Sequence, residues 1–279
     1  MILFKQAKAL SNYLQQQKSN GVSIGFVPTM GALHKGHLSL LDRCKKENGL
    51  TVCSIFVNPT QFDNPDDFKK YPVTIEKDIE ELIRKDCDVL FLPPKEEIYP
   101  IGYQAKVYEL GQLETVLEGK YRPGHFQGVC QVVDRLLEIV HPDQIYLGQK
   151  DYQQCKVIQR LIDLTGRKNP SLIVSPTVRE RDGLAMSSRN LRLNEEQRAK
   201  APALFENLNF VKTHLTSYPI SELKKRATEA LLQKGFKVDY FEIVDAQTLL
   251  PAKDITEPLI AVVAAYLDDI RLIDNLPLS

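Results

Sequence analysis

The stretch His34-Lys35-Gly36-His37 lies between an apolar run at 22–27, which Pro28-Thr29-Met30-Gly31 closes, and an amphipathic stretch at 38–44. A strand that ends in a glycine-containing turn and continues directly into a helix leaves several backbone N–H groups unpaired, and phosphate can bind there. Two histidines three residues apart lie on the same turn of such a helix, and the glycine between them lets a bulky anion approach the backbone closely. The stretch therefore predicts a strand, a turn and a helix that hold a triphosphate.

The composition of the whole chain favours a globular protein that binds small molecules. Its 279 residues are 43% hydrophobic, which is enough for a substantial core. Its 36 basic and 36 acidic side chains give a formal net charge of zero, and no basic run is present, so nucleic acid is not expected as a partner. The longest apolar run, Leu259 to Leu267, is well short of the ~20 residues that span a bilayer, so no membrane helix is expected.

The first residues and the cysteines indicate a cytoplasmic protein. Met1-Ile2-Leu3-Phe4-Lys5 lacks the basic start, the longer apolar core and the cleavage site of a signal peptide. The cysteines are odd in number and widely spaced, which fits reduced thiols better than a disulfide framework or a zinc site. They are Cys44, Cys53, Cys87, Cys130 and Cys155.

Short runs rich in Val, Ile, Leu and Phe alternate with helical patterns over the first part of the chain. This alternation predicts an α/β fold with a mainly parallel sheet that helices cover on both faces. The clearest helix is 126–140, where apolar residues recur at helical spacing and form one buried stripe. The strands are expected at 22–27, 50–57, 88–92, 144–147 and 171–174.

The pattern changes after Arg189 and predicts a second, smaller domain. Asn194 followed by two glutamates is typical of a helix start, and helical pattern continues to about Thr216. A second helix is expected at 221–233, and Asp268-Asp269 should form the turn of a hairpin. Strands are expected at 238–244, 259–267 and 270–276. We therefore predict a Rossmann-like domain at 1–186 and a small α+β lid domain at 187–279.

Polar residues follow four of the predicted parallel strands at the point where each strand ends. In an open α/β sheet, ligands bind beyond these ends, where the strand order reverses. The polar groups stand in Pro28-Thr29-Met30-Gly31, His34 and His37, Asn58-Pro59-Thr60-Gln61, Gly148-Gln149-Lys150-Asp151, Gln154, Val178 and Met186-Ser187-Ser188-Arg189.

Each of these groups also has a plain structural interpretation. A histidine pair near a helix start is more often surface polarity than catalysis, and zinc lacks a third ligand at an obvious spacing. Lys150-Asp151 fits a helix cap, and Ser187-Ser188-Arg189-Asn190 fits a polar loop. Their joint placement at strand ends, and not any single match, favours a functional site.

Several ordered segments resemble the pantoate–β-alanine ligase family of the HxGH nucleotidyltransferase superfamily. The resemblance covers the first 190 residues, whereas the C-terminal part is similar in layout more than in motif. Its segments are Pro28 to His37, Ser54 to Phe62, Tyr71-Pro72, Arg122 to Phe126, Gly148 to Gln154, Pro176 to Glu180 and Asp182 to Asn190.

The resemblance implies a ligase that works in two steps on ATP, pantoate and β-alanine. The pantoate carboxylate attacks the α-phosphorus of ATP to give pantoyl adenylate and pyrophosphate, and the amine of β-alanine then displaces AMP. The residues implied to surround the triphosphate and act catalytically are His34, His37, Lys150, Ser187, Ser188 and Arg189. The further ATP contacts implied are Pro28, Thr29, Met30, Gly31, Gly148, Asp151, Val178 and Met186.

The same resemblance implies the acceptor site, the metal and the assembly. Pantoate would contact Gln61, Gln154, Met30 and Asn58, since an amide side chain offers both a donor and an acceptor. Asp78 matches the position of a ligand to the Mg²⁺ that accompanies ATP. Lys77 precedes it where some relatives carry a second acid, and Gln149 stands where many carry Glu. Arg122 and His125 resemble residues near the active site, and the family implies a homodimer.

Two other functions fit parts of the pattern. A cytidylyl- or adenylyltransferase of the same superfamily would move a nucleotide onto a phosphate ester, but two glutamines without a further basic cluster suit an uncharged diol that bears one carboxylate. A nucleotide-binding module without turnover would not need both histidines, the lysine and the Ser-Ser-Arg loop together.

Overall fold

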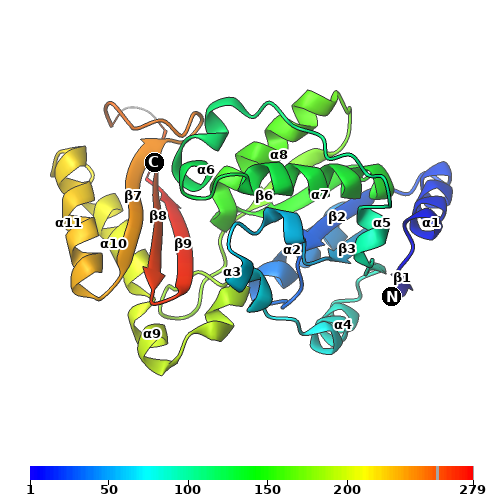
Figure 1. The fold of residues 1–279 in the computed structure, drawn as a ribbon, viewed down its shortest axis with the longest axis horizontal. Helices are drawn as coiled ribbons and strands as arrows, with labels where there is room; N and C mark the ends of the chain where they lie inside the picture. The colour runs from blue at the N-terminus through cyan, green and yellow to red at the C-terminus, as the bar shows by residue number, and fades with distance from the viewer. Residues whose placement is uncertain (256–257, 279) are drawn as a thin grey trace.

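The computed structural model describes residues 1–255 and 258–278 of the chain. A six-stranded sheet forms the centre of the N-terminal part, and every strand pair in it is parallel (Figure 1). The strand order is β1-β4-β3-β2-β5-β6, so the order reverses between β2 and β5. The strands are β1 (Ile2–Phe4), β2 (Ile24–Thr29), β3 (Leu50–Ile55), β4 (Val89–Phe91), β5 (Gln144–Gly148) and β6 (Ser171–Ser175).

Helices cover both faces of this sheet, as the alternating pattern predicted. One face packs against α1, α7 and α8 through a core that includes Leu14, Leu137 and Ile158. The other face packs against α2 and α4 through Leu41 and Leu82. The helices are α1 (Ala7–Ser19), α2 (Lys35–Glu47), α3 (Pro65–Lys69), α4 (Ile75–Arg84), α5 (Lys95–Ile98), α6 (Leu117–Tyr121), α7 (His125–Val140) and α8 (Tyr152–Thr165), with 3-10 turns at Pro59–Gln61, Gly111–Glu114, Gln149–Asp151 and Ser188–Arg192.

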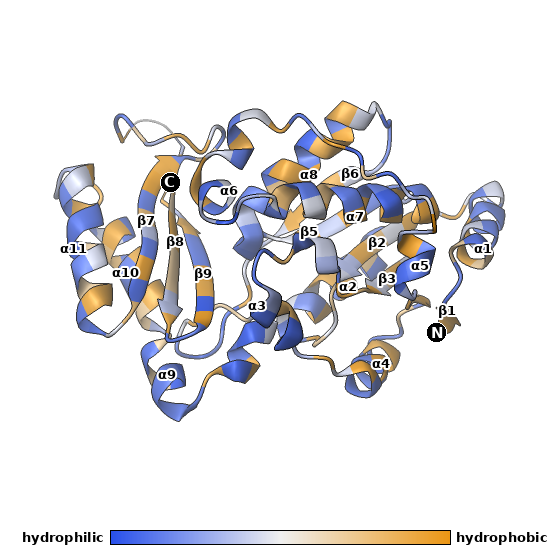
Figure 2. Cartoon of the chain, viewed as in Figure 1, coloured by the Kyte–Doolittle hydropathy of each residue, from blue (hydrophilic) through white to orange (hydrophobic). Residues whose placement is uncertain are grey.

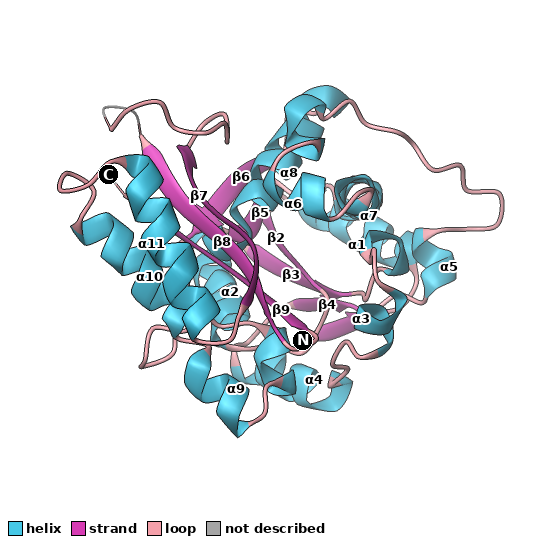
Figure 3. Ribbon diagram, turned by 60° about the vertical axis from the view of Figure 1, so that its left-hand side comes forward, coloured by secondary structure: helices cyan, strands magenta, loops and turns pink. Residues whose placement is uncertain are grey.

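A three-stranded antiparallel sheet forms the small C-terminal part. Its order is β7-β8-β9, and Asp268-Asp269 joins β8 to β9 as the predicted hairpin turn. Helices α10 and α11 lie on one face of this sheet, and the other face is turned toward the large sheet (Figure 3). Figure 2 shows β8 largely in the hydrophobic colour, as expected of a central buried strand. The elements are α9 (Glu195–Lys200), α10 (Ala203–Thr213), α11 (Ile220–Gln233), β7 (Lys237–Asp245), β8 (Leu259–Leu267) and β9 (Ile270–Pro277).

The structure corrects two details of the sequence-based prediction. Strand β1 was not predicted, because its three residues at the sheet edge are too short to show a pattern. The single helix expected from Asn194 to about Thr216 is two helices, since α9 ends at Lys200 and Pro202 directly precedes α10. The predicted helix start is confirmed, because Asn194 and Gln197 form a reciprocal capping box. Among the described residues, no helix is long and apolar enough to cross a membrane.

Candidate active site

One cavity lies beyond the carboxyl ends of β2, β3, β5 and β6, at the point where the strand order reverses. We call it the histidine cavity. Every predicted site residue except Gly31 and Asp78 lines it. Its predicted residues are Pro28, Thr29, Met30, His34, His37, Asn58, Gln61, Gly148, Lys150, Asp151, Gln154, Val178, Met186, Ser187, Ser188 and Arg189.

The two histidines of this cavity are arranged by the start of α2. His34 is the N-cap residue, and its Nδ1 accepts a hydrogen bond from the backbone N–H of Gly36 at 3.1 Å. The rings of His34 and His37 lie 4.0 Å apart between centroids. A Cβ atom on Gly36 would lie 2.8 Å from Cε1 of His34, so a side chain there would displace the ring. Gly36 is therefore needed for the histidine pair itself as well as for access to the backbone.

Both histidines are neutral at neutral pH. Burial, with the positive charge of Lys150 nearby, lowers the pKa of His37 to about 4. Burial, together with His37 and Lys150, lowers the pKa of His34 to about 2. Nδ1 of His37 is buried and has no hydrogen-bond partner among the residues that the structure describes. The pair is therefore suited to hydrogen bonding with an anion as neutral imidazoles, and the standing positive charge comes from Lys150.

These lowered pKa values predict that acid destabilises the protein. Below about pH 6.5, His37 of the unfolded chain binds a proton, whereas the buried His37 of the folded protein does not. The free energy of unfolding therefore falls as pH drops. We expect a loss of about 1 kcal/mol from His37 alone between about pH 7.5 and pH 5.5. Urea unfolding at the two pH values should show that the free energy of unfolding falls less for His37→Gln than for the unchanged protein. Replacement of the exposed His141 by Asn should leave the loss as it was.

Asp78 organises the turn before α2 and does not fit its predicted role as a metal ligand. Its carboxylate accepts hydrogen bonds from the backbone N–H of Ala32 at 2.9 Å and of Leu33 at 2.8 Å, and from Thr74 Oγ1 at 3.0 Å. The residue is 1% exposed and lines no described cavity. Gly31, with a φ of +81°, begins the same turn. In the described part of the chain, no group of three or more His, Cys, Asp or Glu residues is placed to hold a metal ion.

The predicted acceptor residues line the histidine cavity together, and we call them the acceptor wall. They are Met30, Asn58, Gln61 and Gln154. Nε2 of Gln61 lies 3.1 Å from the sulfur of Met30. Asn58 is 1% exposed, and its amide nitrogen donates to Gln61 Oε1 at 3.2 Å and to the carbonyl of Gly128 at 3.1 Å. Asn58 therefore fixes the orientation of the Gln61 amide. Gln154 lines the same cavity from α8.

The loop Ser187-Ser188-Arg189 is already bonded to the large domain. The hydroxyl of Ser188 donates to the carbonyl of Ala32 at 3.0 Å, and the guanidinium of Arg189 donates to Asp67 at 2.7 Å. Ser187 Oγ accepts from the backbone N–H of Arg189 at 3.3 Å. Phosphate contacts by Ser188 and Arg189 would therefore require an exchange of these partners. Lys150 lines the cavity with a looser ion pair, to Asp151 at 3.6 Å.

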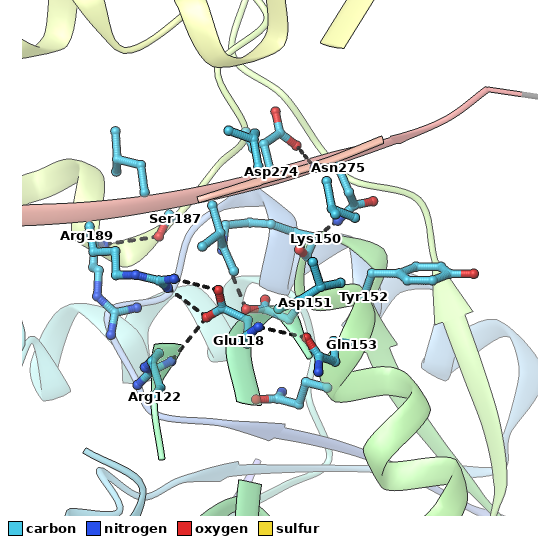
Figure 4. A pocket seen from close by; sticks show the side chains of 18 of the residues that line it. Glu118, Arg122, Lys150, Asp151, Tyr152, Gln153, Ser187, Arg189, Asp274 and Asn275 are labelled. Carbon is cyan, nitrogen blue, oxygen red and sulfur yellow. Dashed lines mark hydrogen bonds and ion pairs between the residues drawn. The ribbon is translucent and has the colours of Figure 1, made fainter. Parts of the chain in front are cut away.

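A second cavity, the interdomain cleft, lies between the two domains (Figure 4). It shares five residues with the histidine cavity, Lys150, Asp151, Gln154, Ser187 and Arg189. Glu118 on α6 forms two bonds of 2.7 Å with Arg271 on β9 across this cleft. Arg122 and His125 line the cleft as well. Nδ1 of His125 lies 2.7 Å from the carbonyl oxygen of Gln61, so this histidine supports the acceptor wall from behind.

Sequence reasoning missed the cleft residues of the small domain. They include Tyr240, Arg271, Asp274 and Asn275. No motif marks them, because their partners stand far away in the chain, as for Arg271 and Glu118 at a separation of 153 residues.

A parallel sheet with a reversal in strand order, and a cavity beyond its strand ends that contains a histidine pair, define the class as a Rossmann-like α/β protein with a ligand site at the reversal. The family model described as pantoate-beta-alanine ligase matches residues 2–277. The chain belongs to the pantoate–β-alanine ligase family.

Individual relatives agree with this assignment over their whole length. The chain is 40% identical to a pantothenate synthetase of Porphyromonas gingivalis, with 99% of each chain covered. It resembles the crystal structure of pantothenate synthetase from Thermus thermophilus with a TM-score of 0.94 and 41% identity, over 100% of this chain and 99% of that one. It also resembles pantoate-beta-alanine ligase from Francisella tularensis, solved in complex with beta-gamma ATP and beta-alanine, with a TM-score of 0.83 and 37% identity over 100% and 98% of the two chains.

Proposed function

We propose that this protein joins pantoate to β-alanine with ATP, through a pantoyl adenylate, and releases AMP and pyrophosphate. Membership of the pantoate–β-alanine ligase family supports the overall ligation. The observation that supports the adenylate route is the histidine cavity, which brings the amides of Gln61 and Gln154 together with His34, His37 and Lys150. The homodimer, the cytoplasmic location and the absence of nucleic-acid binding stay predictions.

In the first step we assign the chain a role of positioning and charge stabilisation. The pantoate carboxylate attacks the α-phosphorus, the new C–O–P bond forms, and the bond to the pyrophosphate oxygen breaks. A carboxylate is already nucleophilic, so no general base is needed. Lys150 would stabilise the charge on the departing pyrophosphate, and the neutral imidazoles of His34 and His37 would donate hydrogen bonds to phosphate oxygens.

In the second step the neutral amine of β-alanine attacks the activated carbonyl, the new C–N bond forms, and AMP leaves with the electrons of the broken C–O bond. The proton that the nitrogen loses passes to solvent. The interdomain cleft opens onto the shared residues Lys150 and Asp151 and offers a route for the amine. A site enclosed by both domains would also protect the acyl adenylate from water. Asp78 has no assigned role in holding Mg²⁺, because its carboxylate is bonded to the backbone of the turn.

The two-step reaction predicts isotope exchange in the absence of β-alanine. ATP and pantoate alone should form the adenylate reversibly, so radiolabelled pyrophosphate should appear in ATP. The control is the same mixture without pantoate, in which no exchange is expected. Exchange that requires β-alanine would contradict the adenylate intermediate.

The acceptor wall predicts a selective effect on pantoate binding. Gln61→Ala removes an amide that Asn58 holds toward the cavity, and loss of such hydrogen bonds costs roughly 1 to 3 kcal/mol. KM for pantoate should therefore rise by roughly 5- to 150-fold, while KM for ATP stays near its normal value. Steady-state kinetics with each substrate varied will separate the two. Equal rises in both values would show that Gln61 supports the site in general.

A further inference from the structure

One buried asparagine of the small domain holds the loop that carries Lys150. Asn275 on β9 is 2% exposed. Its Nδ2 donates to the backbone carbonyl of Gln149 at 2.9 Å and to that of Lys150 at 2.8 Å. In return, Nε2 of Gln149 donates to Asn275 Oδ1 at 3.2 Å. Figure 4 shows Asn275 beside Lys150, with β9 passing over the loop. The whole amide of Asn275 is therefore used on this loop.

Asp274 fixes Asn275 in this position. Its Oδ1 accepts a hydrogen bond from the backbone N–H of Asn275 at 2.8 Å, and its carboxylate pairs with Arg179 at 2.6 and 3.0 Å. Arg179 also donates to the carbonyl of Asn275 at 3.2 Å and to that of Gly183 at 3.1 Å. The backbone of Asn275 is thus held on both sides, so its side chain provides a rigid support.

The Lys150 loop is short, and Asn275 adds two hydrogen bonds to the few that it makes itself. Lys150 is the middle residue of a three-residue 3-10 turn, Gln149–Asp151, that has no side-chain cap. A turn of this length makes few internal hydrogen bonds, so its carbonyls need partners from elsewhere. The side chain of Asn275 donates to two of these carbonyls, those of Gln149 and Lys150.

We propose that Asn275 is a positioning residue for Lys150, through which the small domain sets the place of the lysine ammonium in the histidine cavity. The inference rests on the proposed function for the role of Lys150. A displacement of about 1 Å at a catalytic group can cost about 10²-fold in rate, so loss of two backbone anchors should be visible in turnover. A residue that only joined the domains would change stability and leave the chemistry of Lys150 unaltered.

The test is a double-mutant cycle in the full-length protein, with pyrophosphate exchange into ATP as the readout. Asn275→Ala should lower the exchange rate by about 10-fold or more with an unchanged KM for pantoate. In a Lys150→Ala background the same change should lower it by less than about twofold further, because it acts through the lysine. The matched control is Asn207→Ala, which removes an amide that donates to a backbone carbonyl at 2.8 Å within α10. This control should exchange at the normal rate.

Two outcomes would overturn the inference. One is normal exchange by Asn275→Ala, and the other is an equal fold-loss with and without Lys150. Absence of exchange in the unchanged protein would instead overturn the proposed function, and this inference with it. If Asn275→Ala does not fold, Gln149→Ala is the second variant, because it removes only the bond to Asn275 Oδ1. Gln149→Ala should lower the exchange rate severalfold, and this effect should disappear in the Lys150→Ala background. A normal exchange rate of Gln149→Ala would contradict the proposal.

Discussion

Lys150→Ala should lower kcat by about 10²-fold or more, the usual effect of removing one preorganised group that stabilises transition-state charge. Lys150 is shared by both cavities, and its side chain is only 15% exposed. The two histidines beside it are neutral, and Arg189 is paired with Asp67. Lys150 is thus the cation best placed to meet charge that develops on pyrophosphate. Because that charge grows in the transition state, the loss should appear in kcat more than in KM for ATP.

Steady-state kinetics of the purified variant will measure this effect. The matched control is Lys156→Ala on α8, the helix that directly follows the turn of Lys150. The ammonium of Lys156 lies over the ring of Tyr152, 5.4 Å from its centroid, and lines neither cavity. We expect normal kcat for the control and similar melting temperatures for both variants. A folded Lys150→Ala protein that turns over at a near-normal rate would contradict the proposed role.

The fold could be predicted from sequence because its elements have strong local patterns. Strands such as 144–148 are short apolar runs that end in polar turns, and α7 has one continuous apolar stripe. Since ligand sites in parallel sheets form at strand ends, the same patterns placed His34, Gln61 and Lys150 together. The edge strand β1 lacked a clear local signal, whereas Pro202 marked the break before α10 and the sequence-based prediction passed over it.

The bonding inside the site could not be predicted, because it depends on partners that are distant in the chain. Nothing near Asp78 indicates that its carboxylate binds the backbone of Ala32 and Leu33. The hydroxyl of Ser188 similarly donates to the carbonyl of Ala32, which is 156 residues away in the chain. The neutral state of His34 and His37 could not be predicted from sequence either. Burial lowers the pKa of both side chains, and burial is a property of the folded chain.

Glu118→Gln should destabilise the protein by about 3 kcal/mol, because it leaves a buried arginine without its main partner. The carboxylate of Glu118 forms two bonds of 2.7 Å with Arg271 and accepts a third from Tyr240 at 2.7 Å. The side chains of Glu118 and Arg271 are 10% and 13% exposed, so water cannot replace the lost interaction fully. Arg271 retains its ion pair with Asp239 at 2.8 Å and its place over the ring of Tyr266, so the expected cost is at the low end for a broken buried pair.

The contact between Glu118 and Arg271 joins the two domains, so it also bears on the sequence-based prediction that the small domain is a lid. If domain closure uses the contact, Glu118→Gln should loosen the domains, and solution scattering should show a larger radius of gyration than for the unchanged protein. The matched control is Lys70→Ala, which breaks an exposed pair with Asp269 across the same two domains and should have little effect on stability or size. Equal scattering curves for both variants would contradict a role of Glu118 in holding the domains together.

The pH dependence of the same variant separates lost charge from lost packing. Burial alone would raise the pKa of Glu118, but the bonds to Arg271 outweigh it and lower the pKa to about 2. A carboxylate with a lowered pKa stabilises the fold above the pKa of the unfolded chain, near 4.5, and this stabilisation is lost as pH falls toward 2. The difference in free energy of unfolding between the unchanged protein and Glu118→Gln should therefore be largest near neutral pH and shrink at about pH 3. Urea unfolding at both pH values measures it, and a difference that does not change with pH would assign the loss to packing.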